Sequence, residues 1–446
     1  MKKLVSLLLV SCLAISCFAG CSSAPAPTEP PLELPVATES ASEPPVEETE
    51  TVTEPIEEPV IEPVLTSVGA GFEAWQGEWI NHIPEDGKSI LISPLSLKMA
   101  CLLAADGAEG DTLTQMLDMF GYSSLDEFMD WGEYVLGIQD ELALNAVEEN
   151  VDIDEEGQFF ETWGGTPGST FKIANGIWHN TNEPGEFNAD YKARAARLCA
   201  AIEEMPGAEL KDAINNWANE ATNGLIPEVV GDEVAEMNNI LANALYLKAG
   251  WINEFGEDFV EEDFTTKNGE IVQKTMMTQQ TKFKYYADDT CSFAIMPMYD
   301  NFYMLAVKGD ATGVSEKIGD ASYTLLNLKM PKFEITYSAP NIVDMMKQMG
   351  VKDAFNPDLA DFTGLMDVPT FISAITQDSK IVVDENGIEA AAVTVIQMAT
   401  NGFISDPPQP IDFFLDEAFT FYIYHESYLE DDTVARELLF YGEYNQ

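Results

Sequence analysis

The chain has 446 residues, of which 46% are hydrophobic and 22% are charged. These proportions are typical of a globular protein and exclude a collagen, a coiled coil and a chain that is disordered throughout. Its 22 Lys and Arg residues against 77 Asp and Glu residues give a net charge of −55. Because such a surface repels phosphate groups, we expect neither nucleic-acid binding nor a basic patch on anionic lipids.

The first 20 residues have the pattern of a bacterial export signal. Two lysines precede an apolar stretch, Leu4–Cys17, that is too short to span a bilayer comfortably. Small residues then precede Cys21, which resembles a lipobox, in which the cysteine is acylated and becomes the new N-terminus. We expect residues 1–20 to be a lipoprotein signal peptide and Cys21 to anchor an exported protein to the cell surface. A plain secretory signal cut nearby is the alternative.

Residues 21–69 have the composition of a tether. From Ala24 to Leu65 the chain is rich in Pro, Glu, Thr, Ser and Val and contains no Lys, Arg, Gly or aromatic residue. Such a segment cannot bury enough apolar surface to offset its backbone entropy, and its prolines favour an extended conformation. We therefore expect a disordered spacer over 21–69 and a folded domain over 70–446.

The folded part shows helical patterns early and strand patterns late. The predicted helices cover 93–105, 111–120 with Asp111 as its cap, and 210–221. The predicted strands cover 240–247, 326–330 and 419–424. Residues 140–170 are acidic and predict a solvated excursion. This order favours an α+β fold over a parallel βαβ repeat.

The signatures of catalysis and metal binding are absent from the sequence. It has no nucleotide-binding glycine motif, no GxSxG and no HExxH, and its three histidines are scattered. Asp152–Gly157 resembles a calcium loop only in part, because Trp163 stands where a bidentate glutamate is needed. Cys101, Cys199 and Cys291 would remain after processing, with no CxxC spacing. We expect no enzyme activity, no metal and no cofactor.

The most informative segment is Ile388–Ile404. It carries one charge, contains no proline and is rich in Val, Ile and Thr, so every N–H is free to join a β-ladder. The alanines at its start are poor strand formers, and Gly387 before them is suited to a pivot. One interpretation is an ordinary strand. The other is a strand that must slide into a tight gap, since small side chains would then be needed at its leading end.

From about residue 71 to its C-terminus the chain resembles a serpin. The blocks that carry the resemblance are Ser93–Ser96 with Gly107–Gly110, Lys172–Trp178, Ile214–Trp217, Leu241–Trp251, Met276–Met277, Met330–Phe333, Met349–Gly364 and Val383–Ala392. The last block is similar to the hinge of inhibitory serpins, Glu-x-Gly-Thr-Glu-Ala-Ala. A single block would be weak, but so many in the right order make the resemblance specific.

The resemblance implies an α+β serpin fold with three β-sheets, about nine helices and an exposed reactive-centre loop. It also implies a suicide inhibitor: a target serine protease cuts the loop, and the loop inserts into the main sheet before the acyl-enzyme can hydrolyse. A cysteine protease also forms a covalent intermediate and is a second kind of partner. We expect a monomer. The alternative is a non-inhibitory surface lipoprotein that uses the serpin fold as a binding or adhesive module.

The resemblance assigns roles to individual residues. The hinge comprises Glu385, Gly387, Ile388, Glu389, Ala390, Ala391 and Ala392. A polar cluster under the opening sheet comprises Ser93, Ser96, Asn243 and Gln377, and Trp251 lies where insertion begins. The chain departs from the family pattern at Gln377, where histidine is usual, and at Ile388, where Thr or Ser is common. Neither departure introduces a charge or a proline on the inward face.

The bond that a protease attacks follows from the hinge by counting. In the resembled inhibitors it lies about fourteen residues after the hinge glycine. This count gives Asn401–Gly402, and a loop one residue shorter gives Thr400–Asn401. No Arg or Lys occurs between Ile381 and Arg436, so we do not expect a trypsin-like target. The small and apolar neighbours favour an elastase-like or subtilisin-like serine protease.

Overall fold

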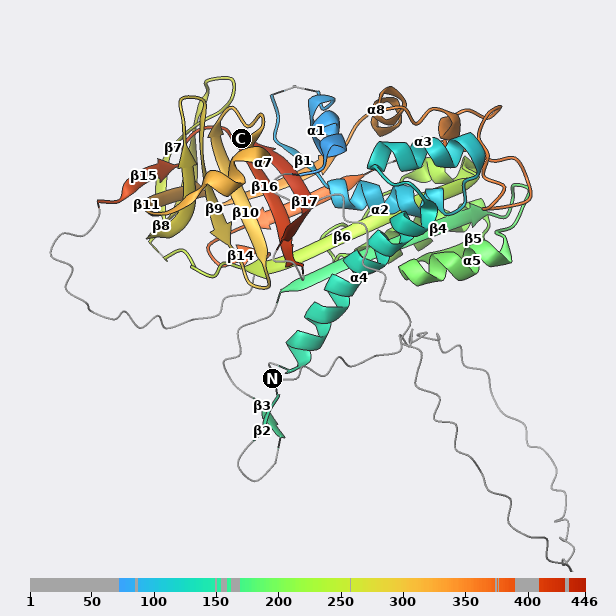
Figure 1. Ribbon diagram of the computed structural model, residues 1–446, viewed down its shortest axis with the longest axis horizontal. Coiled ribbons are helices and arrows are strands. Elements are labelled where there is room, and N and C mark those ends of the chain that lie inside the picture. Colours follow the sequence, from blue (N-terminus) through green and yellow to red (C-terminus); the bar gives the residue numbers. More distant parts are fainter. Residues whose placement is uncertain are drawn as a thin grey trace, which may run out of the picture. The chain divides into compact units, whose positions relative to one another are not determined.

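The computed structural model describes residues 72–84, 87–148, 151–153, 159–161, 169–256, 258–373, 375, 377–389, 409–429 and 433–446. All of them belong to one compact unit, Pro63–Gln446 (Figure 1). The predicted signal peptide, Cys21 and the tether lie outside the described residues. So do Ala390–Ala392 of the hinge and both candidate reactive bonds.

The described residues form eight α-helices, close to the number that the resemblance implies. They are α1 (Ala74–Asn81), α2 (Pro94–Ala105), α3 (Gly110–Phe120), α4 (Leu125–Glu148), α5 (Ala189–Ala195), α6 (Gly207–Ala221), α7 (Val314–Lys317) and α8 (Ile342–Gln348). Short 3-10 helices cover Ala196–Leu198, Asp232–Glu236, Ile318–Asp320 and Asp353–Phe355. No helix among these residues is both long and apolar enough to cross a membrane.

The strands form sheets of nine, six and two strands. The nine-stranded sheet contains β1 (Ile90–Ile92), β17 (Val434–Tyr444), β16 (Phe419–Tyr428), β10 (Phe302–Gly309), β9 (Cys291–Pro297), β8 (Ile271–Ala287), β11 (Ser322–Pro331) and β15 (Ile411–Phe414) in this order, with β7 (Val260–Thr265) also paired to β8. The six-stranded sheet runs β12 (Phe333–Ser338), β13 (Asp378–Val383), β14 (Gly387–Ile388), β6 (Asn239–Gly250), β4 (Thr170–Asn180) and β5 (Ala201–Met205). The small hairpin pairs β2 (Val151–Ile153) with β3 (Phe159–Glu161).

The predicted elements are present, and the α+β class is confirmed. The three predicted strands lie within β6, β11 and β16, and the predicted helices correspond to α2, α3 and α6. Two predictions were wrong in detail. The N-cap of α3 is Glu109, two residues before Asp111, because the helix already includes Gly110 and Asp111 lies in its first turn. Residues 140–148 belong to α4 rather than to a solvated excursion. The helix ends at Glu148, and the β2–β3 hairpin begins at Val151.

Helix α2 lies along the inner face of the six-stranded sheet and connects it to the core (Figure 1). It begins where the sequence predicts, because Pro94 occupies the first turn and Ser93 caps it by accepting a hydrogen bond from the Ser96 amide at 3.2 Å. Nearly all of its side chains are buried. On the outer face, α6 packs over Trp178 and Ile240, which point away from α2. The six-stranded sheet is therefore covered on both faces.

Candidate functional site

The six-stranded sheet is interrupted between β6 and β13. Strand β14 lies between them for two residues only: Gly387 pairs with Gly250, and Ile388 pairs with Ala249 on one side and Val383 on the other. Elsewhere in the described residues, β6 and β13 do not pair with each other. We call the remaining gap, between Asn239–Lys248 of β6 and the described residues of 370–382, the slot.

Cavities flank the slot on both faces of the sheet. The cavity on the α2 side is lined by Ser96, Leu97, Ala100, Cys101, Ala104, Leu241, Asn243, Ile372, Ile375 and Gln377. The cavity on the α6 side is lined by Trp217, Ile226, Val229, Val230, Ile240, Leu241, Ala242, Asn243, Ala244 and Asp378. Each has a volume of only about 20 Å³, which is room for about one water molecule. Leu241 and Asn243 line both cavities, so both small spaces adjoin the slot at the level of these two residues.

The turn that leads into β14 is held rigidly. The Trp251 indole N–H donates to the Asp384 carbonyl at 2.9 Å, and the Trp251 amide donates to the Asn386 carbonyl at 2.9 Å. Lys332 forms an ion pair with Glu385 at 2.5 Å. Although partial burial acts in the opposite direction, the hydrogen bond from Lys332 lowers the pKa of Glu385. Trp251 and Glu385 thus hold the turn at the end of the slot that β14 occupies.

Gly387 is required at the first position of β14. Its φ of +150° is rarely adopted by residues with side chains, and an added Cβ would lie 2.1 Å from the Ala249 carbonyl oxygen. The next residue, Ile388, is only 2% exposed and packs between the two neighbouring strands. An apolar residue therefore suits this position, which explains how the chain tolerates Ile388 in place of Thr or Ser.

Glu389 is the point at which the chain leaves the sheet. Its amide still donates to the Val382 carbonyl at 3.0 Å, but its φ of +46° turns the backbone into the left-handed region. The Tyr246 hydroxyl donates to one carboxylate oxygen at 3.4 Å, and the other oxygen is buried with no partner among the described residues. Burial raises the pKa of Glu389, while Tyr246 and the nearby Lys248 and Lys380 oppose the rise.

The four residues of the predicted polar cluster lie together beneath the slot. The Gln377 side chain accepts from the Ser93 amide at 2.9 Å and donates to the Ser93 carbonyl at 2.8 Å. The Ser96 hydroxyl donates to the side-chain oxygen of Asn243. The cluster thus connects α2 to both walls of the slot, because Asn243 belongs to β6 and Gln377 directly precedes β13.

Sequence reasoning missed one member of this cluster, Asn175 of β4. The Asn243 side chain donates to the Asn175 side-chain oxygen at 2.6 Å, and Asn175 donates onward to the Leu198 carbonyl at 3.3 Å. The two asparagines are directly opposite each other in the β4–β6 ladder. Asn175 stands in one of the blocks that carry the resemblance, so the signal was present, but the pairing register that joins the two blocks was not visible in the sequence.

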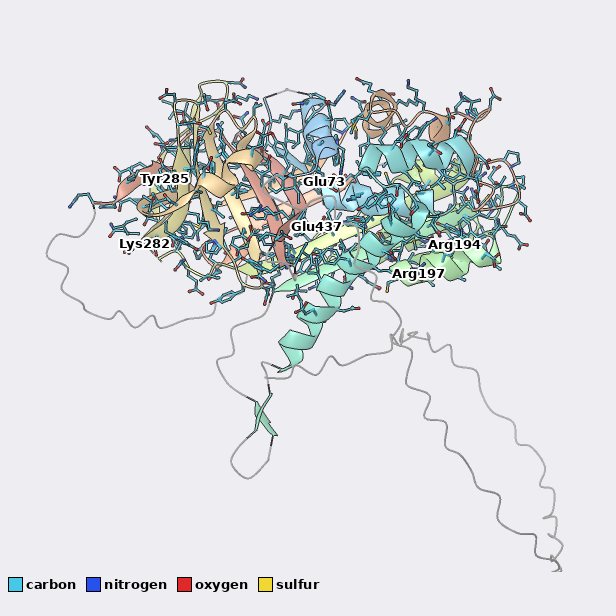
Figure 2. The ribbon with its side chains drawn as sticks, viewed as in Figure 1. Glu73, Arg194, Arg197, Lys282, Tyr285 and Glu437 are labelled. Carbon is cyan, nitrogen blue, oxygen red and sulfur yellow. The ribbon has the colours of Figure 1, made fainter. Side chains whose placement is uncertain are left out.

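A buried ion pair fixes α2 from its other side. Lys98, 1% exposed, contacts Glu73 at 2.6 Å and lies 4.0 Å from the centre of the Trp131 ring. The Trp131 indole N–H donates to Glu437 of β17 at 3.3 Å. Figure 2 labels Glu73 and Glu437 in the central part of the view. Helix α2, which supplies Ser93 and Ser96, is therefore anchored to α1 and to the nine-stranded sheet.

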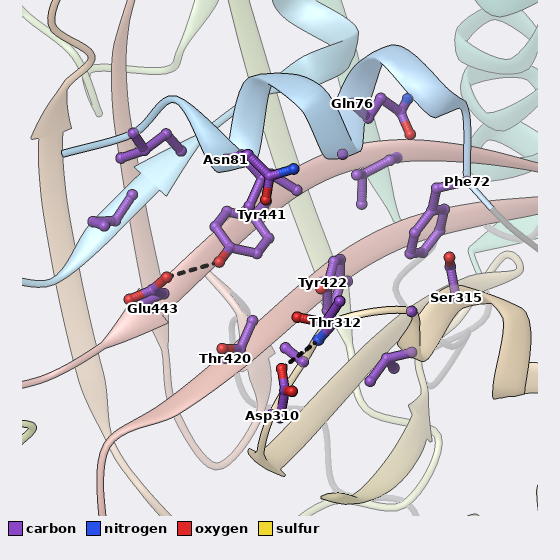
Figure 3. Close-up of a pocket in the computed structure, with 18 of the residues that line it drawn as sticks. Phe72, Gln76, Asn81, Asp310, Thr312, Ser315, Thr420, Tyr422, Tyr441 and Glu443 are labelled. Atoms are coloured by element: carbon purple, nitrogen blue, oxygen red, sulfur yellow. Dashed lines mark hydrogen bonds between the residues drawn. The ribbon is translucent and has the colours of Figure 1, made fainter. Parts of the chain in front are cut away.

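A larger cavity lies away from the slot (Figure 3). Its volume is about 710 Å³, and α1, α7, β16 and β17 contribute to its walls. Its lining combines aromatic side chains such as Phe72, Tyr422 and Tyr441 with polar ones such as Glu443, which accepts a hydrogen bond from the Tyr441 hydroxyl at 2.8 Å. None of the slot residues lines it. Within the described ranges, no group of three or more His, Cys, Asp or Glu residues could hold a metal ion.

Comparison with known proteins gives consistent matches. Residues 80–446 match the model of the Serpin (serine protease inhibitor) family. A putative serpin-Z5 from Oryza sativa subsp. japonica is 26% identical over 386 residues, covering 76% of this chain and 82% of that protein. The structure of the thermophilic serpin tengpin in its native state has a TM-score of 0.66 and 24% identity, covering 83% of this chain and 92% of tengpin.

A complex of thyroxine-binding globulin with thyroxine has a TM-score of 0.62 at 20% identity, covering 83% of this chain and 96% of the globulin. The two structural matches concern the fold, whereas the family match extends over most of the chain. Members of this family are mostly protease inhibitors rather than enzymes. The chain belongs to the serpin family.

Proposed function

We propose that the protein is a suicide-substrate inhibitor of serine endopeptidases of the elastase-like or subtilisin-like kind. The observation that carries the proposal is the slot, whose end next to Gly250 already holds two hinge residues, Gly387 and Ile388. A sheet with an unfilled strand position has unpaired backbone groups, and a strand that fills it gains a ladder of hydrogen bonds on both sides.

The register of β14 predicts where each loop residue goes. Ile388 pairs with Ala249 in an antiparallel ladder, so each residue further along the loop meets one residue earlier in β6. Continuing this register pairs Ala390 with Leu247, Ala392 with Leu245, Thr394 with Asn243 and Ile396 with Leu241. These positions face inward, as Ile388 does, and the first two meet buried leucines. Small side chains at the leading end therefore match the walls they must pass.

The same count puts a hydroxyl at the polar cluster. Ile388 is opposite Val383, so Thr394, six residues later, is opposite Gln377 as well as Asn243. Hydrogen-bonding groups are thus available on both walls for the Thr394 hydroxyl, which would otherwise be buried without a partner. The one polar residue on the inward face of the loop between Ile388 and Ile396 thus meets the level of the slot at which the polar cluster lies.

The trapping reaction uses the protease's own chemistry. The serine hydroxyl of the protease attacks the carbonyl carbon of Asn401, the peptide bond to Gly402 breaks, and the Gly402 amine leaves with a proton. The loop is then joined to the protease through an ester. Insertion carries this ester away from the position in which water would attack it. A cysteine protease would be held through a thioester in the same way.

The test is incubation of the full chain with a panel of serine proteases. Elastase-like and subtilisin-like enzymes are expected to give a band of summed mass that resists SDS, and trypsin-like enzymes are not. Mass spectrometry of the released C-terminal fragment identifies the bond. A fragment that begins at Gly402 supports the first choice, and one that begins at Asn401 supports the shorter loop. A fragment that begins before Met398 or after Ile404 would contradict the count.

We also propose that Cys21 anchors the protein to the bacterial surface, with 21–69 as spacer. Export and acylation follow from the lipobox pattern of the sequence. Replacement of Cys21 by serine should move the protein from the membrane fraction to the soluble fraction and abolish incorporation of labelled fatty acid. Unchanged membrane retention without lipid label would contradict the anchor and leave the inhibitory proposal untouched.

A binding role is the second candidate, and the cavity of about 710 Å³ favours it. One solved serpin fold holds a small molecule, thyroxine. A surface lipoprotein that binds a ligand would need no loop insertion. It would therefore form no SDS-resistant complex with any protease, and cleavage of its loop would leave its melting temperature unchanged. These two outcomes separate the candidates.

A further inference from the structure

We propose that His179, Asn239 and Thr370 form a latch that closes the far end of the slot and sets the rate at which loop insertion is completed. The inference rests on the proposed function, because it names residues that control the same movement. It concerns the end of the slot opposite the hinge, to which nothing above assigns a role.

The latch is a chain of side-chain hydrogen bonds across the slot. Asn239 is the first residue of β6, and its amide nitrogen donates to the Thr370 hydroxyl at 2.9 Å. Thr370 precedes β13 in the chain and belongs to the opposite wall, since it lines the same narrow cavity as Asn239 and Leu241. It is 8% exposed. The bond is therefore partly buried, and it joins the two walls directly.

His179, on the neighbouring strand β4, orients the Asn239 side chain. It lies opposite Asn239 in the β4–β6 ladder, is fully buried, and its Nδ1 is 2.9 Å from the Asn239 side-chain oxygen. Because the nitrogen of that amide donates to Thr370, its oxygen must accept, so Nδ1 of His179 carries the proton. The Phe187 ring packs against the imidazole in a T-shaped arrangement, with the two ring centres 5.8 Å apart. Asn239 is thus held with its donor aimed across the slot.

The bond to Thr370 and an inserted strand exclude each other. Neighbouring strands lie about 4.8 Å apart, so a strand between two walls separates their backbones by roughly 9.6 Å. A side chain as short as asparagine cannot span that distance to a threonine at 2.9 Å. The register of β14 places Met398 opposite Asn239. The hinge and the middle of the loop can enter while the latch is closed, but the last residues before the reactive bond cannot.

The position of the latch gives it a specific consequence. The acyl-enzyme is safe from hydrolysis only when the protease has been carried the full length of the sheet, and the latch opposes the final part of that path. In the uncleaved protein the same bond helps to keep the walls together and the loop outside. We therefore expect the latch to slow insertion without affecting how the protease first recognises the loop.

The test measures how fast insertion follows cleavage. Thermolysin, a metalloprotease that forms no acyl-enzyme, cuts the loop at saturating concentration, and stopped-flow tryptophan fluorescence follows the change at the slot. Trp217, which lines one of the flanking cavities, and Trp251, which contacts the hinge turn, are the reporters. Thr370→Val keeps the shape of the side chain and removes the acceptor. We expect its insertion phase to be about 2- to 10-fold faster than that of the unchanged protein.

Two matched variants separate the latch from a general loss of stability. Thr370→Ser keeps the hydroxyl and should insert at the rate of the unchanged protein. Thr222→Val removes another buried hydroxyl, which donates to the Ala218 carbonyl at 2.8 Å outside the slot, and should insert within twofold of that rate. Asn239→Leu should be as fast as Thr370→Val.

The outcomes bear on different claims. Equal insertion rates for Thr370→Val and the unchanged protein would overturn the latch while leaving the proposed inhibition intact. Equal acceleration by Thr222→Val would also overturn it, because the effect would then be one of stability alone. If the cleaved, unchanged protein shows no fluorescence change and gains no resistance to urea, insertion itself is contradicted, and the latch with it.

Discussion

The two large sheets of this serpin differ in how completely their strands are paired. In the nine-stranded sheet, each strand meets its neighbour along a hydrogen-bonded ladder, and the central strands β16 and β17 pair along almost their whole length, with one irregularity at Ile423 and Tyr424. In the six-stranded sheet, β6 has a full ladder with β4 on one side and only two paired residues on the other.

This difference shows where free energy is stored. A net gain of about 0.5–1.5 kcal/mol for each intramolecular hydrogen bond means that a strand of roughly ten residues filling the slot would gain on the order of 10 kcal/mol. The nine-stranded sheet holds no comparable reserve, because its ladders are already formed. The polar cluster of Ser93, Ser96, Asn243 and Gln377 lies against the sheet that the proposed insertion would change, whereas the cavity beside β16 and β17 lies against the other sheet.

The largest expected effect comes from blocking the slot with a charge. Ala392→Arg places a cation opposite the buried Leu245 and Ser379, where no carboxylate is available, and an unpaired buried charge costs several kcal/mol. We expect the variant to be cut as a plain substrate, with no SDS-resistant complex. Ala391→Arg is the matched control, since its side chain would face outward. Equal loss of complex in both variants would show that the predicted register is wrong.

Cleavage of the loop should remove the difference between the two sheets. We expect the melting temperature of the cleaved protein to exceed that of the intact protein by roughly 10 °C or more, because a paired strand replaces the slot. Differential scanning calorimetry of the two forms is the measurement. The cleaved Ala392→Arg variant serves as the control and should melt close to its intact form. Identical midpoints for the intact and cleaved unchanged protein would mean that the slot stays empty.

A smaller effect is expected from displacing the hinge. Gly387→Ala would put a methyl group 2.1 Å from the Ala249 carbonyl oxygen, so β14 must move away from β6. We expect a loss of about 1–3 kcal/mol of stability in the intact protein and faster amide exchange at Ile388. Gly313→Ala is a useful control, because that glycine also has a positive φ but nothing lies near its Cβ position. Unchanged exchange at Ile388 would show that β14 does not depend on a glycine.

Several elements of the two sheets can be predicted from the sequence, but the contacts between segments that are far apart in the chain cannot. The helix capped by Ser93 and the three strands over 240–247, 326–330 and 419–424 follow from local patterns, and the residues of the polar cluster follow from blocks that resemble the family. The slot does not, because it is a relation between Asn239–Lys248 and residues more than a hundred positions later. The same holds for Asn175 and for the bonds among His179, Asn239 and Thr370. The burial of Lys98 could not be predicted for a different reason. This lysine stands in an apolar helix, and its partner Glu73 lies 25 residues earlier in the chain.

The smallest predicted effect tests whether Glu389 helps to drive the hinge inward. In the intact protein before insertion, which we call the open state, the backbone of Glu389 is in the left-handed region and burial raises the pKa of its carboxyl group. Ionisation of Glu389 therefore costs free energy in the open state. The open state is therefore stabilised at acidic pH, and this contribution is lost as the pH rises through the raised pKa. Lys248 already lies near this carboxylate before insertion, and the register keeps the two residues opposite each other afterwards; what insertion would change is the burial of the carboxylate oxygen that has no partner among the described residues, because Glu389 would then face outward. Ionised Glu389 thus favours insertion.

Glu389→Gln should remove this preference at neutral pH. We expect the intact variant to melt about 1 °C higher than the unchanged protein at pH 7 and its loop to insert up to about threefold more slowly, with both differences vanishing near pH 4, where the carboxyl group is protonated. Glu236→Gln, a change at an exposed carboxylate, should have no effect at either pH. A difference that is the same at pH 4 and pH 7 would show that Glu389 acts through its shape and backbone conformation rather than its charge. The strain at φ +46° would then be the part of the hinge that insertion relieves.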